Sequence, residues 1–249
     1  NLQLNEGSTI SLGQGLAGSA SLAMNSVDIT YQGAATLNLP KLSSFTNGTL
    51  VLAGNGQVFN GPQANRIDGS INGSRIAIND ARTFTVTATN YDTGTRFTNV
   101  DMLSTGGTGA TLNAPNLQTI NGAVDFDGNP YTQRIAAQNG GTINLPSLTT
   151  VAGGAGNDTL EFLVDGSSSM NLSSLQQITG GNVQFTLDSA VDLTSLTGIS
   201  GGTRFRPTAG MTLNLSSLTN FNGSGTWTRG EMTAANGGTI TAPILGSLQ

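Results

Sequence analysis

Thr142-Ile-Asn-Leu-Pro-Ser-Leu-Thr-Thr-Val151 is one copy of a ten-residue phrase that recurs along the chain. The seventh position is leucine in every copy, the second is apolar, and the third is asparagine except at Asp192 and Thr241. A small unit that cannot bury its own apolar side chains, repeated along a chain, indicates a solenoid. The other copies are Thr36–Phe45, Thr111–Ile120, Ser169–Ile178, Ala190–Ile199, Thr212–Phe221 and Thr239–Leu248.

Each phrase begins with the period of a β-strand. In Thr142–Leu145 the polar first and third positions alternate with apolar second and fourth positions, which predicts outward polar and inward apolar side chains. A proline or a hydroxyl residue then breaks the strand. Apolar residues follow at every third position, as in Leu172, Leu175 and Ile178, and this spacing predicts a tight or 3₁₀-like corner.

Further strands are expected after the corner. Asn182–Phe185 is an example of the second alternating strand, and longer coils add a third. Arg134–Ile143 and Glu231–Ile240 are near copies of each other, and Arg75–Phe84 reads as a degenerate copy. Ser21–Met24 is a candidate early rung. No stretch shows a helical period with caps.

The sequence therefore predicts an all-β fold, a right-handed parallel β-solenoid with coils of about 21–31 residues. We expect one domain over residues 1–249, a fragment of a longer repeat protein, with 1–35 and 46–110 least regular. The leucine columns should form a dry core, and the asparagine column should form an amide ladder from coil to coil. The aromatic residues expected in the core are Phe126, Phe162, Phe185, Phe205 and Trp227.

Composition narrows the range of partners. Only 9% of residues are charged, with a single lysine, a net charge of −5 and a pI near 4.4. Nucleic acids and anionic membranes bind clustered Lys and Arg, so neither is an expected partner. The chain has no cysteine, and no apolar run reaches the length that spans a bilayer.

The pattern Leu-x-x-Leu-x-x-Ile-x-Gly followed by an alternating strand resembles receptor L-domains and related bacterial leucine-rich surface proteins. Leu145–Val151 and Leu172–Gly180 carry the resemblance most clearly, and it extends over about two thirds of the chain from residue 36. The chain departs from those domains in its lack of cysteine and its uneven coils. The resemblance implies a cell-surface or secreted solenoid used for recognition.

Catalytic and metal motifs are weak. Gly198-Ile-Ser-Gly-Gly202 has the nucleophile-elbow spacing, but the chain contains no histidine to act as its base. Asp125 and Asp127 share one strand face, as the carboxylate pair of a polysaccharide-active β-helix enzyme would, with Arg134 and Arg229 to neutralise an acidic sugar. No cofactor is expected, and the weak calcium candidates are Asp125, Asp127 and Asp158.

The outward positions of the first strand form the most regular predicted surface. Threonine suits strands and asparagine forms ladders, so a structural role alone explains the pattern. The same array also suits an extended partner such as ice, a glycan or a sister protein strand. We therefore expect a non-enzymatic, extracellular structural or adhesive module that binds a glycan, a matrix polymer or a sister protein. The candidate binding residues are Thr36, Asn38, Thr111, Asn113, Thr142, Asn144, Asn171, Thr212, Asn214, Thr239 and Thr241.

Overall fold

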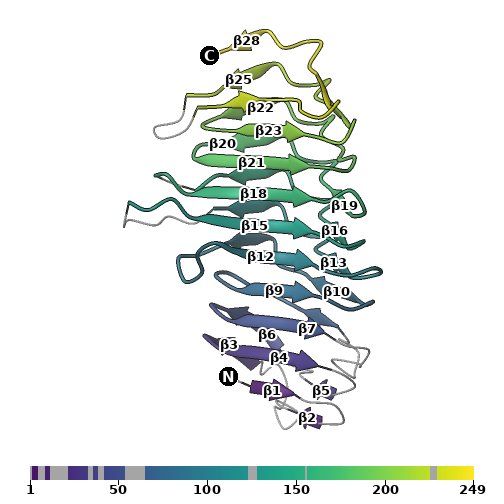
Figure 1. Cartoon of the computed structure of the whole chain (residues 1–249). Coiled ribbons are helices and arrows are strands. Elements are labelled where there is room, and N and C mark those ends of the chain that lie inside the picture. Colours follow the sequence, from purple (N-terminus) through teal and green to yellow (C-terminus); the bar gives the residue numbers. More distant parts are fainter. Residues whose placement is uncertain are drawn as a thin grey trace.

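The chain forms a column of stacked coils (Figure 1). The computed structural model describes residues 2–4, 9–11, 22–32, 36–38, 42–53, 65–122, 128–154, 156–224 and 229–249, with the backbone alone at 2–4, 9–11, 31–32 and 36–38. Within these ranges the chain has strands and no helix, and every pair of neighbouring strands is parallel. The expectation of an all-β parallel β-solenoid is confirmed.

The coils build three walls. The long-strand sheet has ten strands in one continuous array: β1 (Leu2–Leu4), β4 (Asp28–Gln32), β7 (Thr49–Ala53), β9 (Arg75–Ile78), β12 (Val100–Thr105), β15 (Thr132–Ala137), β18 (Thr159–Val164), β21 (Asn182–Leu187), β23 (Arg204–Pro207) and β26 (Glu231–Met232).

The phrase sheet contains the first residues of the phrase: β8 (Arg66–Ile67), β10 (Thr83–Val86), β13 (Thr111–Asn113), β16 (Thr142–Asn144) and β19 (Ser169–Asn171). The same wall has two separate pairs: β2 (Thr9–Ser11) with β5 (Thr36–Asn38), and β24 (Thr212–Asn214) with β27 (Thr239–Thr241).

The closing sheet contains the last residues of the phrase: β11 (Asn90–Asp92), β14 (Thr119–Asn121), β17 (Thr150–Ala152), β20 (Gln177–Thr179), β22 (Gly198–Ser200), β25 (Asn220–Asn222) and β28 (Ser247–Leu248). The pair β3 (Leu22–Asn25) with β6 (Leu42–Thr46) lies on this wall, so the early rung at Ser21–Met24 is confirmed from Leu22 onward.

The apolar columns fill the space between the three walls. The leucines of the seventh column are buried from Leu42 to Leu218, and Leu245 is half-buried in the last coil. Phe162, Phe185 and Phe205 stack through the core with ring centroids 5.0 and 5.1 Å apart. Each coil thus buries side chains that it could not bury alone, as predicted.

The corner has the expected form, but the residue expected to end it lies elsewhere. The corner is a tight turn, in which the N–H of Leu175 donates to the carbonyl of Leu172 at 2.9 Å. Ile178, expected to belong to the corner, instead lies in β20 of the closing sheet. The phrase therefore makes two strands and its coil supplies three, except in the coil where residues 190–192 form no strand. The last apolar residue of the phrase reaches a third wall and completes the core there.

The irregular segment conceals complete coils. Arg66 pairs with Thr85, and Thr85 pairs with Asn113, so two turns of the phrase sheet lie between the first and second recognisable phrases. The coil from Arg66 to Thr85 advances only 19 positions, below the predicted range. Arg75–Phe84 is the predicted degenerate copy, because Phe84 aligns with Leu112 in the phrase sheet.

Candidate functional site

The phrase sheet presents two in-register rows of polar side chains. One row is Thr83, Thr111, Thr142 and Ser169, and the next is Thr85, Asn113, Asn144 and Asn171. These side chains are half-buried or exposed, while the residues between them are buried. The structure thus brings five of the predicted binding residues together and adds three others. Ser169 belongs to a phrase, whereas Thr83 and Thr85 lack the phrase around them.

Hydrogen bonds link the rows from coil to coil. The amide of Asn144 donates to Oδ1 of Asn113 at 2.9 Å, and the amide of Asn171 donates to Oδ1 of Asn144 at 2.8 Å. The hydroxyls of Thr142 and Ser169 are 3.0 Å apart. The predicted amide ladder is therefore present across these three coils.

The ladder ends at Asp192. Residues 190–192 form no strand in the described structure, and a carboxylate lacks the amide hydrogens that would continue the chain of bonds. Asp192 instead accepts hydrogen bonds from the hydroxyl and the backbone N–H of Thr194, which lower the pKa of its carboxyl group.

The remaining predicted residues lie apart from this array. Thr212 and Asn214 pair with Thr239 and Thr241 on β24 and β27, and all four are exposed. The backbone of β5 holds Thr36 and Asn38 on the same wall, but their side chains lie outside the described residues.

A serine ladder runs along the corner beside the phrase sheet. The hydroxyls of Ser147, Ser174 and Ser195 each donate at 2.6 Å to the carbonyl of the preceding coil, at Pro115, Pro146 and Ser173. Sequence reasoning missed this ladder, although its signal is visible as a serine at the sixth position of four phrases.

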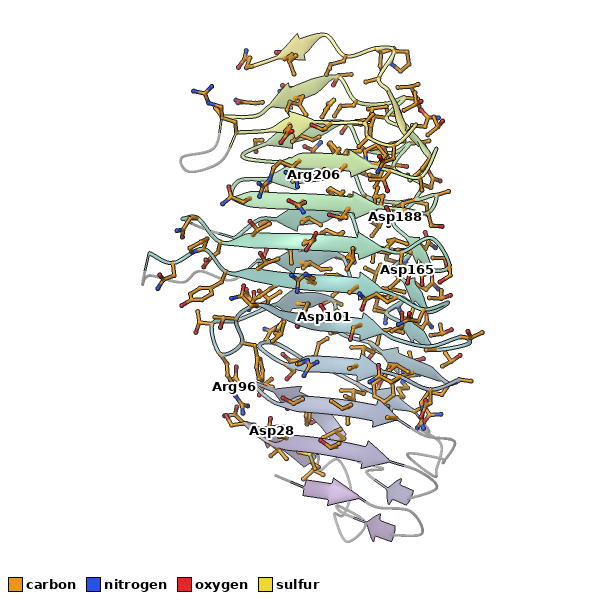
Figure 2. The ribbon with its side chains drawn as sticks, in the orientation of Figure 1. Asp28, Arg96, Asp101, Asp165, Asp188 and Arg206 are labelled. Carbon is orange, nitrogen blue, oxygen red and sulfur yellow. The ribbon has the colours of Figure 1, made fainter. Side chains whose placement is uncertain are left out.

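The outer face of the long-strand sheet has a different chemistry. A single register row contains Asp101, Arg134, Glu161, Gln184, Arg204 and Glu231. Arg134 lies 2.9 Å from Glu161 and 3.7 Å from Asp101. Figure 2 shows Asp101 and Arg206 on the near face of this sheet.

Arg204 and Arg206 flank the core residue Phe205 on β23. Arg206 lies 3.7 Å from Glu231 in the next coil. Burial and the neighbouring Arg206 lower the pKa of Arg204, while Glu231 and Glu161 act in the opposite direction. Arg206 thus pairs with a carboxylate of an adjacent coil.

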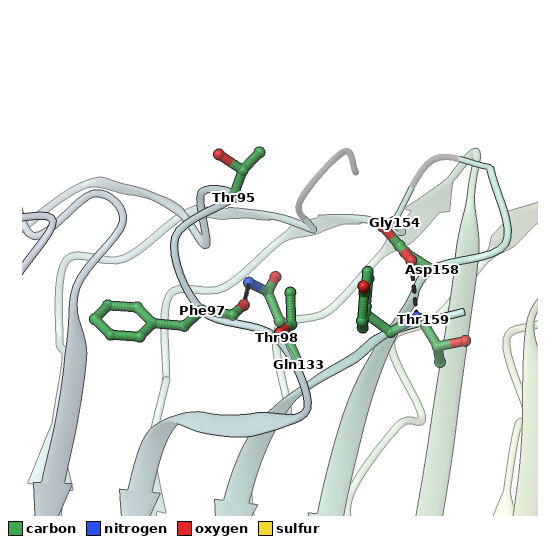
Figure 3. A pocket seen from close by; sticks show the side chains of 8 residues that line it. Thr95, Phe97, Thr98, Gln133, Gly154, Asp158 and Thr159 are labelled. Carbon is green, nitrogen blue, oxygen red and sulfur yellow. Dashed lines mark hydrogen bonds between the residues drawn. The ribbon is translucent and has the colours of Figure 1, made fainter. Parts of the chain in front are cut away.

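A narrow cleft lies where the loop before β12 meets the start of β15 and β18 (Figure 3). Its free volume is about 10 Å³, which is about enough for one water molecule. Asp158, a calcium candidate, is buried here and accepts a hydrogen bond from the backbone N–H of Tyr131 at 2.9 Å. The buried amide of Gln133 binds the carbonyls of Gly94 and Phe97 and holds the loop.

Several predicted residues fall outside the described structure: Asp125, Asp127, Phe126 and Trp227. Arg134, assigned to an acidic sugar in the enzyme hypothesis, lies between two carboxylates, and Arg229 is exposed. Within the described ranges, no group of three or more acidic side chains is arranged to hold a metal ion. The same ranges contain no helix that could cross a membrane.

Comparisons with known proteins add no assignment. Searches against family models, curated proteins and solved structures found no match for this chain.

Proposed function

We propose that the chain is a non-enzymatic, extracellular or cell-surface module that holds a flat polar face rigidly for contact with an extended polymer. The observation that carries the proposal is the register of the phrase sheet. Thr111, Thr142 and Ser169 stand above one another on adjacent strands, about 4.8 Å apart. A periodic surface suits a periodic partner, such as a glycan chain, a matrix polymer or a strand of a sister protein.

Rigidity supports this function. Every inward residue of β13, β16 and β19 is buried in one core cluster that also contains the inward residues of the other two walls. The amide and serine ladders add coil-to-coil hydrogen bonds beside that core. Side chains held in this way lose little further conformational entropy when a partner docks.

The uncharged character of the face favours a neutral polymer. The outward side chains of β13, β16 and β19 are hydroxyls and amides, while the ion pairs of Arg134 lie on the long-strand sheet. A glycan chain offers repeated hydroxyl oxygens for such donors. Ice is the least favoured partner, because Ser169, Ala190 and Asp192 interrupt a lattice of threonines.

The test is cosedimentation with insoluble cellulose, chitin and cell-wall polysaccharide. The double substitution Thr142→Lys with Asn144→Lys places two ammonium groups in the middle of the phrase sheet and should abolish retention. The fold should persist, because Ile143 and Leu145 keep the core.

The matched control is Gln177→Lys with Thr179→Lys, which adds the same charge to exposed positions of β20 on the closing sheet. This variant should be retained like the unmodified chain. Equal retention of all three proteins would leave the phrase sheet with only a structural role.

A further inference from the structure

A recess lined by several hydroxyl and amide side chains opens at the corner between the phrase sheet and the closing sheet. It has a free volume of about 400 Å³ and is lined by Gly69, Ser70 and Asn72 from one coil and by 87–90 from the next. This volume lies within the range typical of small-molecule sites. The recess belongs to the irregular segment that carries no recognisable phrase.

The recess exists because two successive corners are shortened. In a regular coil six positions separate the inward residues at the two ends of the corner, as from Ala114 to Ile120. The corresponding step is five positions from Val86 to Tyr91. It is four positions from Ile67 to Ile71. The carbonyls of Ser70 and Asn72, on either side of Ile71, accept hydrogen bonds from the backbone N–H groups of Phe45 in β6 and of Asn47. The shorter path removes the ridge that a full corner would form.

Gly69 fixes the floor of the recess. Its φ of +103° lies in the region that favours glycine, and a Cβ at this position would lie 1.9 Å from the carbonyl oxygen of Ser43. The backbone at Gly69 therefore packs directly on the preceding coil. This close packing fixes the position of the backbone at the base of the recess.

Buried hydrogen bonds keep the short coil in place. The hydroxyl of Tyr91 donates to the carbonyl of Ser74 at 2.6 Å, and the hydroxyl of Ser74 donates to the carbonyl of Phe45 at 2.7 Å. Burial, with a smaller contribution from Asp92, raises the pKa of Tyr91, so its hydroxyl stays protonated as a donor. The recess is thus preformed, which lowers the cost of binding.

The lining offers hydrogen-bond donors. The hydroxyl of Ser70 accepts the N–H of Asn72, Oδ1 of Asn72 accepts the N–H of Asp92, and the hydroxyl of Thr89 accepts the amide of Asn90. Within the described structure, this leaves the hydroxyl hydrogens of Ser70 and Thr89 and the amide hydrogens of Asn72 for a ligand.

We propose that the recess binds a neutral saccharide. Such a ligand presents several acceptor oxygens within the span of one sugar unit, which matches the three donors. An anion is disfavoured, because none of the described residues that line the recess is cationic. The neighbouring Arg66 is already paired with Asp68 at 2.6 Å, and the chain carries a net charge of −5. This site is separate from the phrase sheet and does not depend on the function proposed for it.

The experiment titrates isotope-labelled protein with cellohexaose, chitotetraose and oligogalacturonate while backbone amide shifts are followed by NMR. A neutral oligosaccharide should shift the amides of 69–72 and 87–90. The substitutions Ser70→Ala with Thr89→Val remove two donors with little change of shape and should weaken binding by about tenfold.

The matched control, Ser216→Ala with Thr219→Val, makes the same chemical changes at a full-length corner and should leave the titration unchanged. Thermal unfolding of each variant verifies the fold. Absence of shifts with both neutral probes, equal affinity in the recess variant, or stronger binding of oligogalacturonate would overturn the proposal. The phrase-sheet variant Thr142→Lys with Asn144→Lys should still bind at the recess, so failure of one site is distinguishable from failure of the other.

Discussion

The phrase sheet is made from the most repetitive residues of the chain, whereas the long-strand sheet is made from much less repetitive ones. Yet the long-strand sheet is continuous over ten strands, and the phrase wall is divided into three sheets. The two faces also differ in how the side chains of neighbouring coils pair. An amide ladder joins like to like, so Asn113, Asn144 and Asn171 must be identical. An ion-pair row joins opposites, so the residue type has to change from coil to coil.

A residue type that recurs from coil to coil therefore indicates a side chain that pairs with its own kind. It does not indicate the sheet with the most backbone hydrogen bonds. Strands β15, β18 and β21 have six residues each, twice the length of β13, β16 and β19, and so make more backbone hydrogen bonds per coil. Asp101, Arg134 and Glu161 show no repeat at all, although they occupy one register row. The contrast between the two faces leads to three graded tests.

The largest effect is expected in the core that both faces share. Phe185 lies between Phe162 and Phe205, and Phe185→Ala should lower the free energy of unfolding by about 3–5 kcal/mol. Urea denaturation followed by circular dichroism measures the change. Leu163→Ala, at an outward and half-buried position of β18, is the control and should cost much less. If both variants lost the same free energy of unfolding, the idea that the two faces depend on a common core would be contradicted.

A smaller effect is expected in the charge row. Arg134→Met leaves the nearly buried Glu161 without its arginine and should cost about 1–3 kcal/mol at low ionic strength. The loss should shrink in about 1 M salt, because salt screens the remaining charges. Arg206→Met removes a pair that is nearly half exposed and should cost less than about 1 kcal/mol. A salt-independent loss at Arg134 would indicate packing by its stem instead.

The smallest effect is expected in the serine ladder. Ser174→Ala removes the hydrogen bond to the carbonyl of Pro146 and should cost about 1 kcal/mol. Because the partners are neutral, the loss should be the same at low and high salt. Ser217→Ala changes the same phrase position where the described structure has no such bond, so it should cost less. A marked salt dependence for Ser174→Ala would contradict the distinction between a neutral ladder beside the phrase sheet and an ion-pair row on the long-strand sheet.

Much of the fold could be predicted from the sequence, because the periodicity itself records which residues face inward. Leu117, Leu148 and Leu175 are all buried, as their column indicated. The two coils around β8 and β10 were not recognisable. They have shortened corners, and Phe84 and Asn65 occupy positions where the phrase has an aliphatic residue. A phrase pattern cannot detect a coil whose corner has lost residues.

The candidate sites were less predictable. Thr142 and Asn144 were identified because they repeat, but the recess arises from residues that are missing, and no motif records a deletion. The charge row depends on register across coils of unequal length, so Arg134 and Glu161 cannot be paired before the loops are placed. Both features required the three-dimensional stacking to become visible.

The ladders also give the column a direction. Asn144 donates to Asn113, Ser174 to Pro146, and Thr219 to Thr197, so in each case the hydrogen comes from the later coil and the acceptor from the earlier one. The small bond dipoles of these rows point the same way and add along the axis. The face is therefore polar along the solenoid axis, and the two possible orientations of a partner that lies along it differ in energy.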